Sequence, residues 1–214
     1  MSTTNDYIRL EWSDIVPDRP FTNPDHNVED AATLQYMLER LRDLLGQPEA
    51  VPAQTYPYVL YLAEANGRSH RIAIANSNEL LTCPELAVVG FCGHKWPQAD
   101  RTPLETIDEK LIGEFLQHPH LLSYSSLQLE LGDWRNLVLF SHPQGIGHWA
   151  ISALHASAAR DLAPGYYQNI RLHNAVLPGG LMAGNQLILT RTKYYDYQNQ
   201  TLWWAVRELG EGSH

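Results

Sequence analysis

The chain has 214 residues, 44% of them hydrophobic and 18% charged, which is enough apolar content to bury one sizeable core. The formal net charge is −9 and lysine is scarce, so we expect neither nucleic acid nor an anionic membrane as a partner. No signal peptide or apolar run of membrane-spanning length is visible. With Cys83 and Cys92 as the only thiols, these features predict a cytoplasmic protein with reduced cysteines.

The first 26 residues are polar, interrupted by proline and without period, which predicts an extended N-terminal arm. A helix is expected to begin at Asn27, a favourable N-cap, and to end at Gly46. Its apolar stripe has helical spacing and comprises Leu34, Met37, Leu38, Leu41, Leu44 and Leu45. Two β-rich runs around Asn66-Gly67 predict a hairpin with a two-residue turn, so residues 27–84 form a helix and β-hairpin extension.

Residues 85–210 follow a more regular order. The expected elements are strand 85–96, helix 102–118 with a capping box, strands 121–131 and 134–142, helix 145–161 and strands 186–197 and 201–209. The first six elements have the order β-α-β-β-α-β, which predicts an α+β fold with a ferredoxin-like core. A single open sheet of this kind leaves one face uncovered, which favours a homodimer.

The order of elements carries a family resemblance, together with the strand "NLVLFSHP" leading into a helix that contains Trp149 and His155. On these features residues 85–197 resemble the dimeric α+β barrel superfamily, which includes antibiotic-biosynthesis-type and haem-degrading monooxygenases. The resemblance implies two ferredoxin-like units that pair their sheets into a barrel, with a hydrophobic cavity between each sheet and its helices. It also implies either haem or no cofactor.

The stretch "GIGHWAISALHASAARD", residues 145–161, is compatible with several kinds of site. Gly145 and Gly147 fit a G-x-G-x-x-A nucleotide fingerprint, but four residues separate them from the preceding strand and no strand ending in an acidic residue follows. His148 and His155 are seven residues apart, about 10 Å along a helix, which is too far for one zinc ion. We therefore predict no metal site.

A haem site would need one axial histidine in an apolar pocket. His155 is the candidate because it lies in mid-helix among alanines, with Trp149 as an apolar wall. His148 and His173 are the other histidines that we assign to cofactor binding. The alternative for His155 is an ordinary hydrogen bond inside a closely packed layer of helix and sheet.

The following segment, "PGYYQNIRLHNAVLPGGL", adds polar candidates. If it is helical, Tyr167 and Arg171 share one face, where a phenol and a guanidinium suit a ligand oxyanion. The alternative is that Arg171 pairs with an acidic neighbour such as Asp161 at the surface. Cys92 and His94 share a face of a strand, but a small buried thiol is the simpler interpretation of Cys92.

The leading hypothesis is a small-molecule-binding protein, a monooxygenase or isomerase acting on an aromatic, polyketide-like or tetrapyrrole ligand. In that hypothesis His155 is the base or axial ligand, and Arg171 and Tyr167 hold an oxyanion. One alternative is a non-enzymatic structural or regulatory dimer with contacts through the C-terminal aromatic residues Tyr194, Tyr195, Tyr197, Trp203 and Trp204. Another is a nucleotide-dependent oxidoreductase, which requires Gly145 and Gly147 to face a phosphate-sized opening.

Overall fold

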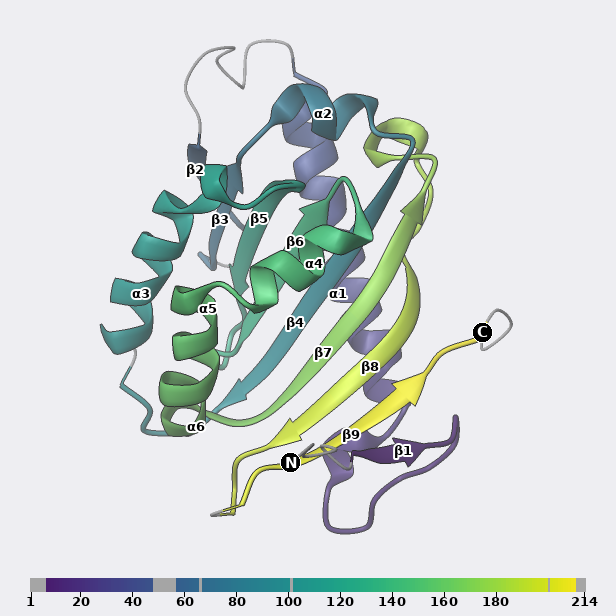
Figure 1. Cartoon of the computed structure of the whole chain (residues 1–214), viewed down its shortest axis with the longest axis vertical. Helices are drawn as coiled ribbons and strands as arrows, with labels where there is room; N and C mark the ends of the chain where they lie inside the picture. Colours follow the sequence, from purple (N-terminus) through teal and green to yellow (C-terminus); the bar gives the residue numbers. More distant parts are fainter. Residues whose placement is uncertain (1–6, 48–56, 66, 101, 200, 211–214) are drawn as a thin grey trace.

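The computed structural model of the chain describes residues 7–47, 57–65, 67–100, 102–199 and 201–210. Within these residues nine strands form one sheet in the order β1-β9-β8-β7-β4-β6-β5-β3-β2 (Figure 1). The strands are β1 Ile8–Leu10, β2 Tyr58–Ala63, β3 Ser69–Ile74, β4 Glu85–Lys95, β5 Leu121–Gln128, β6 Trp134–Phe140, β7 Tyr167–Pro178, β8 Ile188–Asp196 and β9 Trp203–Glu208. The β1–β9 pair is parallel and the other neighbouring pairs are antiparallel, so the sheet is mixed.

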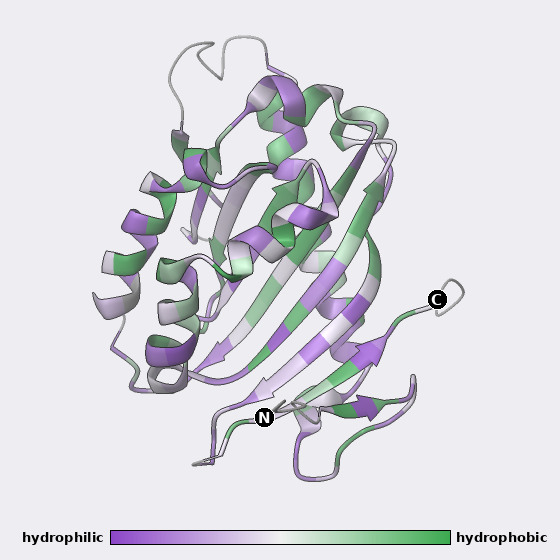
Figure 2. Ribbon diagram, in the orientation of Figure 1, coloured by the Kyte–Doolittle hydropathy of each residue, from purple (hydrophilic) through white to green (hydrophobic). Residues whose placement is uncertain are grey.

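Helices cover both faces of the sheet (Figure 1). They are α1 Asp25–Leu45, α2 Ser77–Thr82, α3 Thr102–Gly113, α4 Pro143–Ala150, α5 Ala153–Ser157 and α6 Ala163–Tyr166, with a π-helical turn over Ala158–Leu162 between α5 and α6. The long helix α1 lies on one face, and α3 to α6 lie on the other. Hydrophobic and hydrophilic residues alternate along α3, as expected for a helix with one buried side (Figure 2). The central strands β4, β5 and β6 are buried at successive positions, because helices cover both faces of the sheet.

The largest apolar core lies between α1 and the sheet. The α1 stripe of Leu34, Met37, Leu38 and Leu41 is fully buried against side chains from strands such as β3, β4 and β6. Gly90 of β4 permits this close approach, because a Cβ atom there would lie 2.3 Å from Leu34 Cδ1. A second apolar cluster, which includes Phe115, Tyr124 and Trp149, lies on the opposite face.

The predicted ferredoxin-like core and dimeric α+β barrel are wrong. The order β-α-β-β-α-β is present along residues 85–178, but its strands are the middle of a nine-stranded mixed sheet and do not form a compact four-stranded unit. The sheet continues through β3 and β2 on one side and through β8, β9 and β1 on the other. Helix α1 of the same chain covers the face that the prediction left bare, so a bare face no longer favours a homodimer, which stays a prediction.

These strands come from all three predicted segments of the chain, the arm (1–26), the extension (27–84) and the domain (85–210). The predicted helix 27–45 is confirmed, although it begins at Asp25, and Asn27 lies inside it and exchanges hydrogen bonds with Tyr194. The predicted hairpin is also confirmed. Its ladder ends at the pair Ala63 and Ser69, so the connection is longer than two residues; Asn66 lies outside the described residues.

Two predicted helices differ from the structure. The single helix over 145–161 is divided at Ile151 and Ser152, where α4 ends and the Ser152 hydroxyl caps α5 by accepting a hydrogen bond from the backbone N–H of His155. The segment after Tyr166 is strand β7, not a helix. Among the described residues, no helix has both the length and the apolar character needed to cross a membrane.

Candidate functional site

A cavity of about 980 Å³ lies between the sheet and helices α3 to α6. Its floor is formed by side chains of the strands from β2 to β8. Its roof includes a series of small residues on α5, the π-helical turn and α6, namely Ala156, Ala158, Ala159 and Ala163. These alanines project little into the space beneath them, which leaves room for a ligand between roof and floor.

Strand register arranges the polar groups of the floor. Cross-strand pairing links Tyr61, Arg71, Ser126, Asn136, Phe91, Leu172 and Lys193 into one row from β2 to β8. Directly paired residues project to the same face of a sheet, and every member of this row lines the cavity. The row therefore has polar groups toward both ends and in the middle, with the apolar pair Phe91 and Leu172 between Asn136 and Lys193.

One wall of the cavity is aromatic and centres on Trp149 of α4. The Trp149 ring lies 5.7 Å from Phe115, 6.5 Å from Tyr124, 4.7 Å from His118 and 5.3 Å from His155, measured between ring centroids. Trp149 is buried and fixed by these contacts, so it forms a rigid surface against which a flat ligand can pack.

His155 brings an unsatisfied polar atom to the same wall. It lines the cavity, and its Nδ1 atom is buried with no hydrogen-bond partner among the described residues. Burial lowers the pKa of His155; a hydrogen bond of the ring to the Ala150 backbone opposes this shift, and repulsion from the nearby His118 adds to it. The ring is therefore held in its neutral form, in which one nitrogen can accept a hydrogen bond or a proton from a bound molecule.

The end of the cavity below α3 contains an ion pair. The Arg71 guanidinium of β3 pairs with the Asp108 carboxylate of α3 and donates a second hydrogen bond, of 3.2 Å, to the Ser126 hydroxyl. The same guanidinium lies 5.8 Å from the centre of the Tyr124 ring. These contacts hold α3 against the sheet and leave Arg71 with its charge already compensated.

The structure separates the predicted catalytic residues. Tyr167 and His155 both line the cavity, as does Trp149. Arg171 lies on the opposite face of the sheet, so it cannot share an oxyanion site with Tyr167. Of the other residues assigned to a cofactor, His148 is exposed on α4, and His173 is fully buried on the α1 side.

Arg171 and His173 instead surround Asp30 of α1. The Asp30 carboxylate accepts hydrogen bonds from Arg171 Nε at 2.5 Å, Arg171 Nη2 at 3.0 Å and His173 Nε2 at 3.0 Å, and Arg135 Nε lies 3.4 Å away. His173 Nδ1 lies 2.9 Å from the Thr192 hydroxyl. Burial alone would raise the pKa of Asp30, but the hydrogen bonds from His173 and Arg171 lower it well below its usual value.

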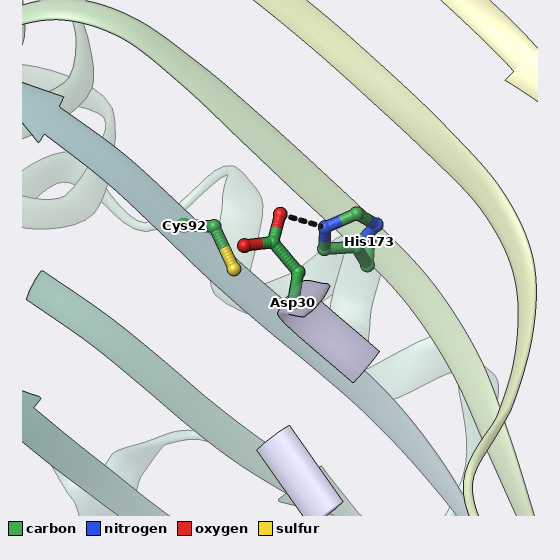
Figure 3. A group of neighbouring side chains, drawn as sticks. All are labelled: Asp30, Cys92 and His173. Atoms are coloured by element: carbon green, nitrogen blue, oxygen red, sulfur yellow. Dashed lines mark hydrogen bonds and ion pairs between the residues drawn. The ribbon is translucent and has the colours of Figure 1, made fainter. Parts of the chain in front are cut away.

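Asp30, Cys92 and His173 have potential metal-ligand atoms within 4.8 Å of one another, and Asp30 points between the two strands that carry the others (Figure 3). Two properties oppose a metal ion here. The Asp30 carboxylate is already engaged by guanidinium groups, and burial raises the pKa of the Cys92 thiol well above its ordinary value, which disfavours the thiolate that a metal requires. We therefore interpret this cluster as an anchor between α1 and the sheet.

The nucleotide alternative finds no support in the geometry. A Cβ atom on Gly145 would lie 2.8 Å from Phe140 and 2.9 Å from His120, so this glycine permits close packing. Neither Gly145 nor Gly147 lines the cavity. The barrel from which haem was inferred is absent, so haem stays a prediction; of its four proposed residues Trp149 and His155 line the cavity, whereas His148 and His173 do not.

Sequence reasoning missed several polar residues of the cavity, in particular Arg71, Asp108, Asn136 and Lys193. The available signal was alternation along the strands, which puts these strand residues on one face, but only the sheet register shows that they meet. Comparisons with protein-family models, with curated proteins and with solved structures gave no match to the chain.

Proposed function

We propose that the chain binds an elongated, largely apolar small molecule in the cavity between the sheet and helices α3 to α6. The observation that carries this proposal is the cavity itself, whose volume of about 980 Å³ is at the upper end of the range typical of ligand sites. Interiors of proteins are otherwise close-packed, so a space of this size lined by aromatic and aliphatic side chains favours an occupant.

The lining indicates the kind of molecule. Trp149 and Phe91 offer aromatic surfaces, and the alanine roof leaves a flat space above them. The unpaired Nδ1 of His155 favours a ligand that carries a hydroxyl or another donor near Trp149. This combination suits an aromatic or polycyclic molecule with a few polar groups, bound in the cytoplasm, where Cys83 and Cys92 stay reduced.

A fluorescent apolar probe tests the proposal. N-phenyl-1-naphthylamine, which is uncharged, is expected to bind saturably with enhanced emission. Ala156→Trp places a large side chain in the roof and should weaken binding by at least about tenfold. Ala153→Trp is the matched control, because Ala153 is exposed on the same helix and does not line the cavity.

Leu172→Trp is a second blocking variant, from the floor of the cavity, in case the roof variant does not fold. Circular dichroism and urea unfolding report whether each variant keeps the native fold. Saturable binding that neither blocking variant weakens, in variants that stay folded, would show that the probe binds elsewhere. Failure of the wild-type chain to bind the probe would also overturn the proposal.

A further inference from the structure

Three cationic side chains line the cavity within the described residues, and they differ in how their charges are compensated. Arg71 pairs with Asp108, and Arg160 pairs with Asp161 through hydrogen bonds of 2.8 and 2.9 Å. Lys193 of β8 has no carboxylate within ion-pair distance and no hydrogen-bond partner among the described residues. It is therefore the cavity's one cation without a counter-charge in that part of the chain.

The position of Lys193 makes the lack of a counter-charge energetically unfavourable. Its backbone is paired with Leu172 on one side and with the buried Val206 on the other, and its side chain is half-buried. Burial lowers the pKa of Lys193, and Arg191 two residues away lowers it further, while Glu208 opposes the shift. Glu208 is itself engaged by Arg191 at 2.8 Å. An ammonium group partly removed from water without a counter-ion is stabilised by any anion that enters the cavity.

The floor next to Lys193 is apolar. Leu172 lies one strand away and Phe91 two strands away in the same row, about 10 Å from Lys193 across the sheet at ordinary strand spacing. A molecule whose ring system covers Phe91 and Leu172 below the alanine roof would therefore extend an end group to the Lys193 ammonium.

We propose that the ligand of this cavity is an apolar, ring-containing molecule with one anionic group, and that Lys193 binds that group. This inference rests on the proposed function, because it specifies the chemical class of the molecule bound at the same site. A carboxylate, a sulfonate or an ionised phenol satisfies it equally, since each offers an oxygen that accepts a charge-assisted hydrogen bond from the ammonium.

The test compares two probes that differ in charge. 8-Anilinonaphthalene-1-sulfonate and N-phenyl-1-naphthylamine share the same ring system, but only the first carries a sulfonate. Lys193→Met should weaken sulfonate binding about tenfold and change binding of the neutral probe by less than about twofold. Lys193→Arg keeps the charge and should retain most of the sulfonate affinity.

Lys110→Met is the matched control, because Lys110 is exposed on α3 and does not line the cavity. It should leave both affinities unchanged. Equal weakening of both probes by Lys193→Met would overturn the inference, since it would make Lys193 a packing residue. The inference would also be overturned if Lys193→Met left binding of the sulfonate probe intact while Ala156→Trp abolished it. That result would still support the proposed function. If neither probe bound the wild-type chain, the proposed function itself would be overturned.

Discussion

The two faces of the sheet use the same strands for different purposes. On the α1 face, Arg171 and His173 of β7 point to Asp30 and form a buried polar cluster around its carboxylate. On the other face, Leu172 of the same strand lines an open cavity. Because side chains alternate along a strand, one segment builds both an anchor for a helix and the floor of a site.

The difference lies in how polar groups are satisfied. Below α1 the Asp30 carboxylate accepts hydrogen bonds from Arg171 and His173 of β7, and Arg135 of β6 lies within ion-pair distance, so the negative charge of Asp30 is compensated inside the protein. In the cavity the Nδ1 of His155 and the ammonium of Lys193 have no partner of this kind among the described residues. Groups of the first kind hold the fold together, and groups of the second kind are available to a ligand.

The largest effect is expected when the Asp30 carboxylate, which anchors α1 to the sheet, is removed. Asp30→Asn leaves the Arg171 guanidinium buried without a counter-charge, and we expect a loss of about 3–5 kcal/mol in the free energy of unfolding. Urea unfolding measures this loss. Asp161→Asn removes a surface partner of Arg160 and should leave the midpoint unchanged. Equal midpoints for Asp30→Asn and wild type would show that the cluster is not an anchor.

Packing on the α1 face gives a second, smaller effect. Gly90→Ala places a methyl group 2.3 Å from Leu34 Cδ1, so the buried Leu34 side chain must leave its present position or α1 must move with it. The expected loss is about 1–3 kcal/mol in the free energy of unfolding, again measured in urea. Gly113→Ala in α3 is the control, since a Cβ atom there meets nothing within 4 Å. If both variants were equally stable, α1 would not be packed closely at Gly90.

On the cavity face, the buried His155 should make the stability of the protein depend on pH. Burial lowers the folded-state pKa of His155 below the unfolded value of about 6.5, so the unfolded chain binds the proton first as the pH falls. The stability of the wild type should therefore fall between pH 7.5 and 5.5. His155→Gln should make this fall smaller, whereas the exposed His148→Gln should not. The measurement is the urea midpoint of each variant at the two pH values. If His155→Gln lost as much stability as the wild type, His155 would not be buried in its neutral form.

The smallest effect concerns the two thiols. Cys92 is buried beside Asp30 and its pKa is raised by burial, whereas Cys83 is partly exposed in the loop before β4. Ellman's reagent should therefore titrate one thiol in the native protein and two in urea. Rapid reaction of both native thiols would mean that the α1 face opens readily to solvent.

Local patterns in the sequence predicted several secondary-structure elements but not the fold. The apolar stripe of α1, the hairpin of β2 and β3 and strand β4 are where periodicity and turn residues put them, because these signals are local. The residues of strand β7 are also compatible with a helix, since tyrosine, arginine and asparagine in 166–174 suit either structure. The nine-stranded sheet was missed because edge pairing between distant strands leaves no local signal.

The candidate site was predicted only in part. Trp149, His155 and Tyr167 line the cavity, but Arg171 pairs with Asp30, which is 141 positions away in the chain. Such a partner is invisible without the register of β7 and the position of α1. Lys193 was likewise one of only three lysines, yet nothing in the sequence indicated that its side chain faces a cavity.

The most direct test of the account is a crystal structure of the chain with N-phenyl-1-naphthylamine bound. We predict density for its rings between the alanine roof of α5 and α6 and the floor formed by Phe91 and Leu172, next to Trp149. Density only outside this cavity, for example against the exposed aromatic residues Tyr7 and Trp12 near the N-terminus, would contradict the claim that this face of the sheet is the binding site.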